Sequence, residues 1–219
     1  MNQPATDNTS SFLFLTAEIR WFRKGDIPAD LHSWFHKSKY IQRYGSRIDT
    51  YLLFPNAETV GVKFRENRFE IKSFVKKLDP VFITDHIRGI PEVWEKWSLA
   101  GNSVSWLFSE MGRDPSIWVD VKKSRTIIKY SADGEEILEM DASGTQGLPG
   151  DGCYAELTEV DINGKLFWTI GFEAFSKRKD IADNLIRTVR CFFNSIEIHL
   201  PEEESFSYPT LLKRIYSEK

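Results

Sequence analysis

Apolar and charged residues alternate along much of this chain, with the period of two that is typical of β-strands buried on one face. The clearest example is residues 63–72, KFRENRFEIK, in which apolar residues separate the charged ones. A two-residue turn at Glu66 and Asn67 would make this segment a hairpin. That register gathers four charged side chains on one face, namely Lys63, Arg65, Glu70 and Lys72. The hairpin therefore devotes a whole face to fixed charge.

Two earlier segments show the same alternation and predict strands. Residues 11–22 place Glu18 and Arg20 on one side and leucine, isoleucine, alanine and tryptophan residues on the other. Residues 46–54 form a second strand of this kind, whose polar side carries Arg47 together with an aspartate and a tyrosine. Each strand thus has one charged face and one apolar face.

The most specific hairpin signal lies near the end of the chain. The dipeptide Asn163-Gly164 predicts a two-residue turn, because both positions of such turns favour residues that tolerate positive φ. This turn places Glu156 opposite Gly171 and diagonal to Glu173. A glycine at that position leaves space for a ligand beside the glutamate.

Residues 116–141 predict a strand followed by a long hairpin. A three-residue loop ending at Gly134 separates the faces best. It gathers the charged residues Arg125, Lys129, Glu139 and Asp141 on one side. It leaves the opposite side to Ile128, Tyr130, Leu138 and Met140.

Three segments have helical spacing of their apolar residues, namely residues 25–38, 91–100 and 179–196. The last of these is strongly amphipathic and needs an apolar surface to cover. Residues 142–152 form the one glycine-rich loop, and its glycines do not follow the pattern of a phosphate-binding loop.

Two architectures fit strands with one charged and one apolar face. An open or sandwiched antiparallel sheet shows its charged face to water. Alternatively, the sheet closes into a barrel with a charged lumen and buries its apolar outer face under helices. The amphipathic helices and the bulky aromatic residues on the apolar faces favour the second architecture. We therefore predict an α+β fold: an antiparallel β-barrel, or tunnel, with a charged lumen and amphipathic helices packed outside.

Composition limits the partners of such a barrel. The 219 residues carry a formal net charge of −3, and 41% of them are hydrophobic. This balance gives no reason to expect a nucleic acid or an anionic membrane as a partner. The two cysteines are too few for a disulfide framework, and the N-terminus lacks the pattern of a secretory signal. We expect a cytoplasmic protein whose lysines and arginines are concentrated locally.

The charges are also sorted along the sequence. Lysine and arginine dominate the middle strands, whereas carboxylates mark the first and last ones. Cations bind a chain of phosphate groups, and carboxylates hold a divalent cation that bridges to phosphate oxygens. This sorting favours an anion clamp next to a site for Mg²⁺ or Mn²⁺.

The order of these motifs resembles the CYTH superfamily, the triphosphate tunnel metalloenzymes. That family opens with a Glu-x-Glu-x-Lys strand, and this chain has Thr16-Ala17-Glu18-Ile19-Arg20 in the comparable place. An Asp-x-Tyr strand is matched by Asp49 and Tyr51, and a basic hairpin by Lys63-Phe64-Arg65 and Lys72. A later basic strand and the closing acidic strands are similar to those that carry Arg125, Lys129, Glu156 and Glu173. The resemblance spans about residues 12–176.

The polar N-terminus and the absence of an internal repeat or a linker indicate the organisation of the chain. We expect residues 1–11 to be a disordered leader and residues 12–200 to form a single CYTH-like barrel domain. Residues 201–219 are expected to form a C-terminal tail that packs on the surface through Tyr208 and Leu211.

The resemblance implies site residues and a reaction. The catalytic and metal-binding residues would be Glu18, Glu156 and Glu173, holding Mg²⁺ or Mn²⁺. The substrate-binding residues would be Arg20, Arg47, Lys63, Arg65, Lys72, Arg125 and Lys129. The partner is then a small phosphorylated anion, and the reaction is metal-assisted transfer of a phosphoryl group to water by a triphosphatase-like phosphohydrolase.

The chain departs from the family pattern where the metal would bind. Thr16 stands in place of a glutamate, and the closing Glu-x-Glu pair is reduced to Glu156 with Thr158. Fewer carboxylates weaken the affinity for hard divalent cations. Three hypotheses therefore stand: a phosphohydrolase, a binding module of the same fold that holds a phosphorylated ligand without turning it over, and an unrelated barrel for an apolar ligand.

Each candidate residue also has a purely structural interpretation. Glu18 would pair with a cross-strand arginine, and Glu156 and Glu173 would be held by arginines of the tunnel. The basic hairpin would be a solvated face in which Glu70 pairs with its neighbours.

Overall fold

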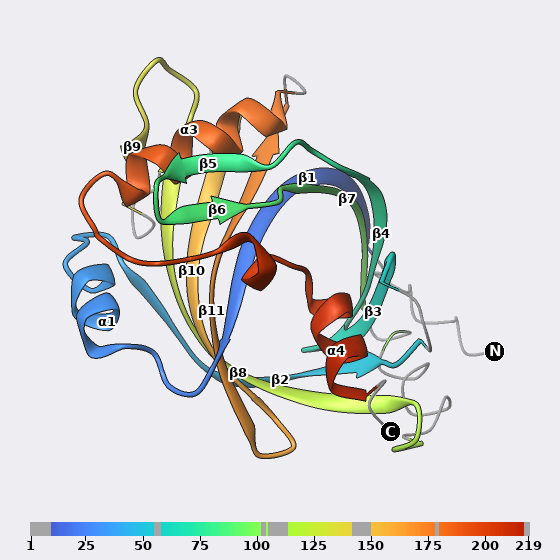
Figure 1. Ribbon diagram of the computed structural model, residues 1–219. Helices are drawn as coiled ribbons and strands as arrows, with labels where there is room; N and C mark the ends of the chain where they lie inside the picture. The colour runs from blue at the N-terminus through green and yellow to red at the C-terminus, as the bar shows by residue number, and fades with distance from the viewer. Residues whose placement is uncertain are drawn as a thin grey trace.

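The structure, a computed structural model, describes residues 10–54, 58–101, 104, 114–141, 150–177 and 180–216. Its central feature is a closed barrel of eight antiparallel strands (Figure 1). The barrel strands are β1 (Ser10–Lys24), β2 (Gln42–Leu52), β3 (Val60–Arg65), β4 (Arg68–Lys77), β7 (Glu92–Ala100), β8 (Trp118–Ser131), β10 (Asp151–Ile162) and β11 (Lys165–Ser176).

The barrel closes because β10 pairs on both of its edges. Around the barrel the strands follow the order β10, β11, β1, β7, β4, β3, β2 and β8, and β8 pairs back onto β10. Closure leaves these strands without a free edge and separates an interior face from an exterior face. Alternate residues of every strand therefore point inward.

Alternation places the charged faces inside, as the sequence predicts. In β1, Glu18 and Arg20 line the interior cavity, whereas the neighbouring Ile19 and Trp21 are buried on the outer side. The Asn163-Gly164 turn also forms as predicted, and Glu156 lies opposite Gly171. The prediction of an α+β barrel with a charged lumen is confirmed.

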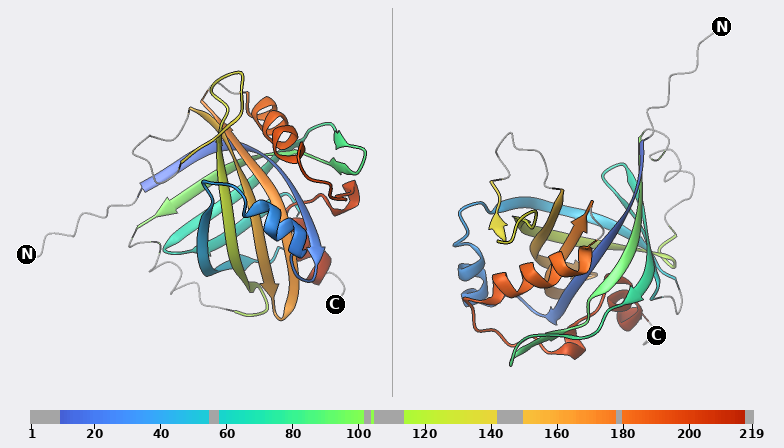
Figure 2. Two further views of the ribbon diagram at one scale, coloured as in Figure 1. Left: turned by 90° about the vertical axis from the view of Figure 1, so that its left-hand side faces the viewer. Right: turned by 90° about the horizontal axis from the view of Figure 1, so that it is seen from above.

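Helices and a small hairpin cover part of the outer face. Helix α3 (Ile181–Phe193) lies across β10, β11 and β1, as Figure 2 shows from two further directions. The short helix α1 (Ala29–Phe35) and the hairpin of β5 (Val81–Thr84) and β6 (Ile87–Gly89) pack against the same apolar cluster. Burying these apolar side chains is what stabilises the barrel from outside.

A second apolar cluster fills one end of the barrel. Helix α4 (Tyr208–Tyr216), preceded by the 3₁₀ turn Glu202–Glu204, lies over this end. Its Leu211 and Leu212 pack with interior residues such as Phe22 and Val121. Tyr208 and Leu211, the residues expected to anchor the C-terminal tail, both belong to this cluster, and the tail closes the lumen at one end.

The prediction of a helix at residues 91–100 is wrong, because this segment is the barrel strand β7. Val93, Trp94 and Trp97 have helical spacing, but β7 pairs with β1 on one edge and with β4 on the other. The backbone hydrogen bonds of these two strand pairings outweigh the local preference for a helix. As a strand, the segment turns Trp94 and Lys96 toward the interior cavity.

The predicted three-residue loop at Gly134 is also wrong. Strand β9 (Leu138–Glu139) pairs Tyr130 with Glu139, so that the connection is six residues long. This register puts Glu139 on the outer side, where it lines a surface pocket with Tyr130, and Asp141 is exposed. Both therefore lie outside the lumen.

Two of the predicted segments include residues that the structure does not describe. Residues 1–9 of the expected leader and residues 142–149 of the glycine-rich loop lie outside the described ranges. Among the helices that the structure does describe, none is long and apolar enough to cross a membrane.

The close packing of β6 on β1 makes a testable prediction. A methyl group at Gly89 would lie 2.6 Å from Trp21 Cζ2 and 2.7 Å from Ile19 Cδ1. Gly89→Ala should therefore lower the free energy of unfolding in urea by about 1–3 kcal/mol through overpacking. Gly45→Ala is the matched control, because a methyl group there meets no atom within 4 Å. Equal stability of the two variants would contradict this packing.

Candidate functional site

The barrel interior contains two connected spaces. The inner chamber has a volume of about 110 Å³ and lies next to the end that α4 covers. The mouth, toward the other end, has a volume of about 1110 Å³. Four residues line both spaces and connect them, namely Arg65, Lys96, Arg125 and Glu173.

All ten residues predicted to be catalytic, metal-binding or substrate-binding lie in this interior. Nine of them line the inner chamber: Glu18, Arg20, Arg47, Lys63, Arg65, Lys72, Arg125, Glu156 and Glu173. The tenth, Lys129, lines the mouth. They come from β1, β2, β3, β4, β8, β10 and β11, so that closure of the barrel is what brings them together.

Cations outnumber carboxylates in the inner chamber. Eight lysines and arginines line it: Arg20, Arg47, Lys63, Arg65, Lys72, Lys96, Lys123 and Arg125. Five glutamates line it as well: Glu18, Glu70, Glu92, Glu156 and Glu173. Asp49 adds a sixth carboxylate through its ion pairs with these cations. Lysines and arginines therefore outnumber carboxylates here although the chain as a whole carries −3, and burial lowers the pKa of two of these lysines, Lys96 and Lys123.

Asp49 is the centre of the largest ion-pair group. Its Oδ2 lies 3.2 Å from Lys63 Nζ and 3.1 Å from Lys123 Nζ, and its Oδ1 lies 3.0 Å from Arg47 Nε. Burial alone would raise the pKa of Asp49, but the three cations outweigh burial and hold this pKa well below its usual range. The carboxylate thus stays ionised and fixes three cations at the chamber wall.

The β3–β4 hairpin positions a second group. Glu66 and Asn67 both have positive φ, as a two-residue hairpin turn requires, and the turn pairs Lys63 with Glu70. Glu70 Oε2 lies 3.1 Å from Lys63 Nζ, and Arg65 Nη2 donates to Glu70 Oε1 at 2.6 Å. The predicted charged face therefore exists, and it faces the lumen instead of bulk water.

Glu156 is held between two arginines. Its Oε1 accepts from Arg20 Nη1 at 3.1 Å and its Oε2 accepts from Arg125 Nη1 at 3.0 Å. Burial favours a raised pKa for Glu156, but the two arginines lower this pKa well below its usual range. The space opposite Glu156 is not free for a ligand, because a methyl group at Gly171 would lie 2.6 Å from Arg20 Cζ. Gly171 makes room for the guanidinium.

The remaining predicted carboxylates also have cationic partners. Lys72 Nζ forms a hydrogen-bonded ion pair with Glu18, and Thr16 Oγ1 donates to Glu18 Oε1 at 2.9 Å. Glu173 Oε1 lies 3.9 Å from Lys96 Nζ, a looser contact than the others. Thr16, which replaces a family carboxylate, is thus a hydrogen-bond donor to Glu18.

This arrangement does not fit a divalent cation. Mg²⁺ and Mn²⁺ need several oxygen ligands whose charge is not already compensated, but Glu18 and Glu156 are paired with lysine and arginine. Within the described ranges, no group of three or more histidine, cysteine, aspartate or glutamate side chains is arranged to hold a metal ion. The metal site at Glu18, Glu156 and Glu173 stays a prediction.

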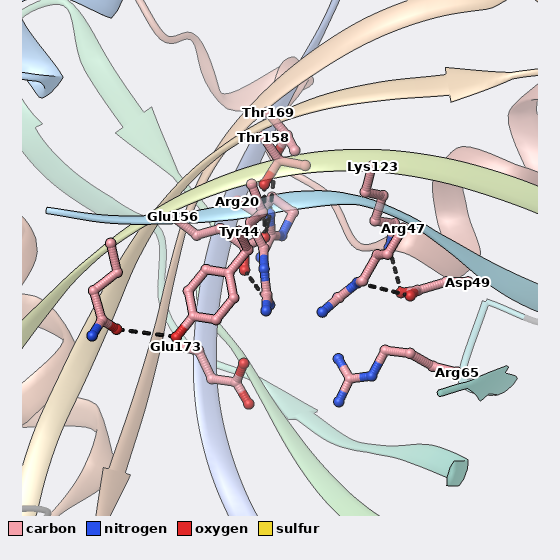
Figure 3. Close-up of polar contacts among 12 residues, drawn as sticks. Arg20, Tyr44, Arg47, Asp49, Arg65, Lys123, Glu156, Thr158, Thr169 and Glu173 are labelled. Carbon is pink, nitrogen blue, oxygen red and sulfur yellow. Dashed lines mark hydrogen bonds and ion pairs between the residues drawn. The ribbon is translucent and has the colours of Figure 1, made fainter. Parts of the chain in front are cut away.

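Several hydrogen-bond donors of the chamber residues have no partner among the described residues. Figure 3 shows the guanidinium groups of Arg47 and Arg65 and the carboxylate of Glu173 pointing toward the same central space. The buried atoms Arg65 Nε, Arg125 Nε and Tyr208 Oη have no hydrogen-bond partner in the part of the chain that is described. Burial raises the pKa of Tyr208 well above its usual range, so its hydroxyl remains a donor. Buried polar groups of this kind require a partner.

Several residues of the chamber were not predicted from the sequence, among them Lys96, Lys123 and Tyr208. Lys96 was hidden by the helix predicted over β7. Lys123 lies on the same inward face of β8 as Arg125, and this alternation was a signal that could have found it. Tyr208 lines the chamber under Lys123, whose Nζ lies 3.6 Å from the ring centroid. Nothing in the local sequence of Tyr208 points to the lumen.

Comparison of the chain with protein-family models and with curated proteins found no match.

The depressed pKa values predict how the site responds to acid. A carboxylate whose pKa is lower in the folded state stabilises the fold above its unfolded pKa, near 4, and loses this contribution as the pH falls further. Asp49→Asn should therefore cost about 3–5 kcal/mol at pH 7, because three buried cations lose their partner. It should also reduce the loss of unfolding free energy between pH 5 and pH 2.

Urea unfolding across this pH range measures both effects. Glu159→Gln is the control, since Glu159 is an exposed carboxylate in β10. An Asp49→Asn variant as stable as the wild type at pH 7, or with the same acid dependence, would refute the role of Asp49 as an ionised hub.

Proposed function

We propose that this protein binds a small phosphorylated anion in the inner chamber of the barrel. The observation that carries the proposal is the convergence of eight lysine and arginine side chains on one enclosed space in a chain of net charge −3. Enclosure matters because charged hydrogen bonds are stronger where water is largely excluded. Arg65, Arg125 and Tyr208 line this chamber, and each has a buried donor atom without a hydrogen-bond partner among the described residues.

The kind of donor favours an oxyanion such as phosphate over a simple halide. Arginine offers a planar fork that matches two oxygens of one phosphoryl group, and lysine adds a point charge. Arginines and lysines reach the chamber from several strands, so that they surround an anion from several directions. The chamber volume of about 110 Å³ equals the liquid volume of roughly four water molecules, which is room for a short phosphate group.

The resemblance to the triphosphate tunnel metalloenzymes supports the same ligand class. Their reaction needs a metal ion that bridges carboxylates and phosphate oxygens. Here the corresponding carboxylates Glu18 and Glu156 hold cations of the chamber wall. Binding without turnover is therefore the function that the geometry supports best, and metal-assisted hydrolysis stays a prediction.

Binding can be tested with inorganic diphosphate and tripolyphosphate as probes. Each should raise the unfolding temperature, and a probe at 100 times its Kd adds about 2.7 kcal/mol of stability. Arg65→Ala should weaken the Kd about 10- to 100-fold in isothermal titration calorimetry, because a charged donor in the chamber is lost. Lys122→Ala, at an exposed position on the outer side of strand β8, should leave the Kd unchanged.

Turnover is measured in the same samples. Phosphate release from tripolyphosphate with Mg²⁺ or Mn²⁺ would show hydrolysis and overturn the restriction to binding. No thermal shift with either probe, or equal effects of Arg65→Ala and Lys122→Ala, would refute the chamber as an anion site.

A further inference from the structure

The mouth of the barrel differs chemically from the inner chamber. Its wall contains the apolar and aromatic side chains of Phe14, Tyr44, Ile127, Tyr154 and Phe175, whereas the inner chamber is walled mainly by charge. Its volume of about 1110 Å³ is also far larger than that of the chamber. A phosphate group alone would leave this apolar wall in contact with water.

The cations at the mouth lie against aromatic rings. Arg125 Cζ lies 5.0 Å from the ring centroid of Tyr44, and Lys129 Nζ lies 5.7 Å from that of Tyr154. Lys96 Nζ lies 5.4 Å from the ring centroid of Phe14. Attraction between a cation and a ring face holds each charge at the wall. The centre of the mouth is thus bordered by side chains with both charged and apolar atoms.

The apolar surface continues onto the rim. Leu13 is 64% exposed, Leu15 is 48% exposed and Phe14 is 39% exposed, and all three line the mouth. Contiguous exposed apolar residues next to a cavity mark a surface that a ligand covers. The apolar rim leads into the mouth, and the mouth leads through Arg65 and Arg125 into the charged chamber.

The order of these surfaces, from apolar rim to mixed mouth to charged chamber, indicates the shape of the ligand. We infer that the anion is amphiphilic: a phosphoryl head group sits in the inner chamber, and an apolar body attached to it lies in the mouth. The inference rests on the proposed function and adds the chemical class of the ligand. The ion pairs also limit the size of the head group. Most of the chamber cations already have carboxylate partners, so only a small excess of positive charge is left for the ligand.

A series of n-alkyl phosphates tests the inference directly. Ethyl, butyl, hexyl and octyl phosphate, used below their aggregation concentrations, are titrated into the full chain by calorimetry, with inorganic phosphate as the reference. Each methylene that the mouth buries should improve the Kd about fourfold, until the apolar wall is covered. Phenyl phosphate provides a second arm: tighter binding than butyl phosphate would assign an aromatic body, and weaker binding would assign a hydrocarbon body.

A matched pair of variants locates the effect. Phe14→Thr removes an aromatic ring from the mouth, and it should reduce the ratio between the affinities for octyl phosphate and inorganic phosphate by about tenfold or more. Phe82→Thr removes a ring that is 60% exposed in the outer hairpin strand β5, and it should leave this ratio unchanged. Circular dichroism confirms that both variants are folded.

The possible failures are distinguishable. If inorganic phosphate and diphosphate bind but the Kd does not depend on chain length, the inference about the apolar body is wrong and the proposed function stands. If none of the phosphates binds, the proposed function itself is wrong. If octyl phosphate binds more tightly but Phe14→Thr and Phe82→Thr behave alike, the apolar body lies elsewhere and the inference is overturned.

Discussion

Ion pairs between carboxylates and cations inside a closed barrel are the interaction on which this structure depends. Eight lysines and arginines face one small space, and they would repel one another strongly there without compensation. Asp49, Glu70 and Glu156 each hold at least two of them. The carboxylates are therefore the framework of the site, and the cations that they orient are the groups that remain to meet a ligand. This division of roles reverses the one expected from a metal-dependent enzyme, in which the carboxylates themselves hold the reactive centre.

The rest of the fold protects this interior. The apolar outer face of β1, β10 and β11 is covered by α3, α1 and the β5–β6 hairpin, while α4 closes one end with Leu211 and Leu212. Polar contacts join the two regions, since Tyr208 lies under Lys123 and Arg20. The chamber is thus closed at its base by apolar packing and opens toward a mouth of mixed character.

The sequence predicts the barrel, its polarity and most of the site, because strand alternation is a local property that survives folding. The register of the Asn163-Gly164 hairpin could be derived because both turn residues accept positive φ. The register at Glu66-Asn67 could be derived because a two-residue turn keeps the charged residues on one face. Strand β7 could not be predicted, because the spacing of its tryptophans fits a helix. The segment is a strand because it pairs with β1 and β4, which are distant in the sequence. The sequence left open whether Glu18 and Glu156 meet a metal ion or basic side chains, because this depends on which cations the closed barrel brings next to them. The contact of the Arg20 guanidinium with Gly171 could not be predicted for the same reason, because it joins two strands that are far apart in the chain.

The ion pair between Arg20 and Glu156 joins residues 136 positions apart. Such a contact forms only after the first strand has met the last ones, so the chain must pass through states in which the sheet is still open. An open sheet usually aggregates through its edges and its uncovered faces. In this protein the inner face of the unfinished sheet carries lysine, arginine and glutamate, which favour water over contact with another copy. The charges that attract an anion to the finished barrel would therefore also keep its half-assembled precursor in solution.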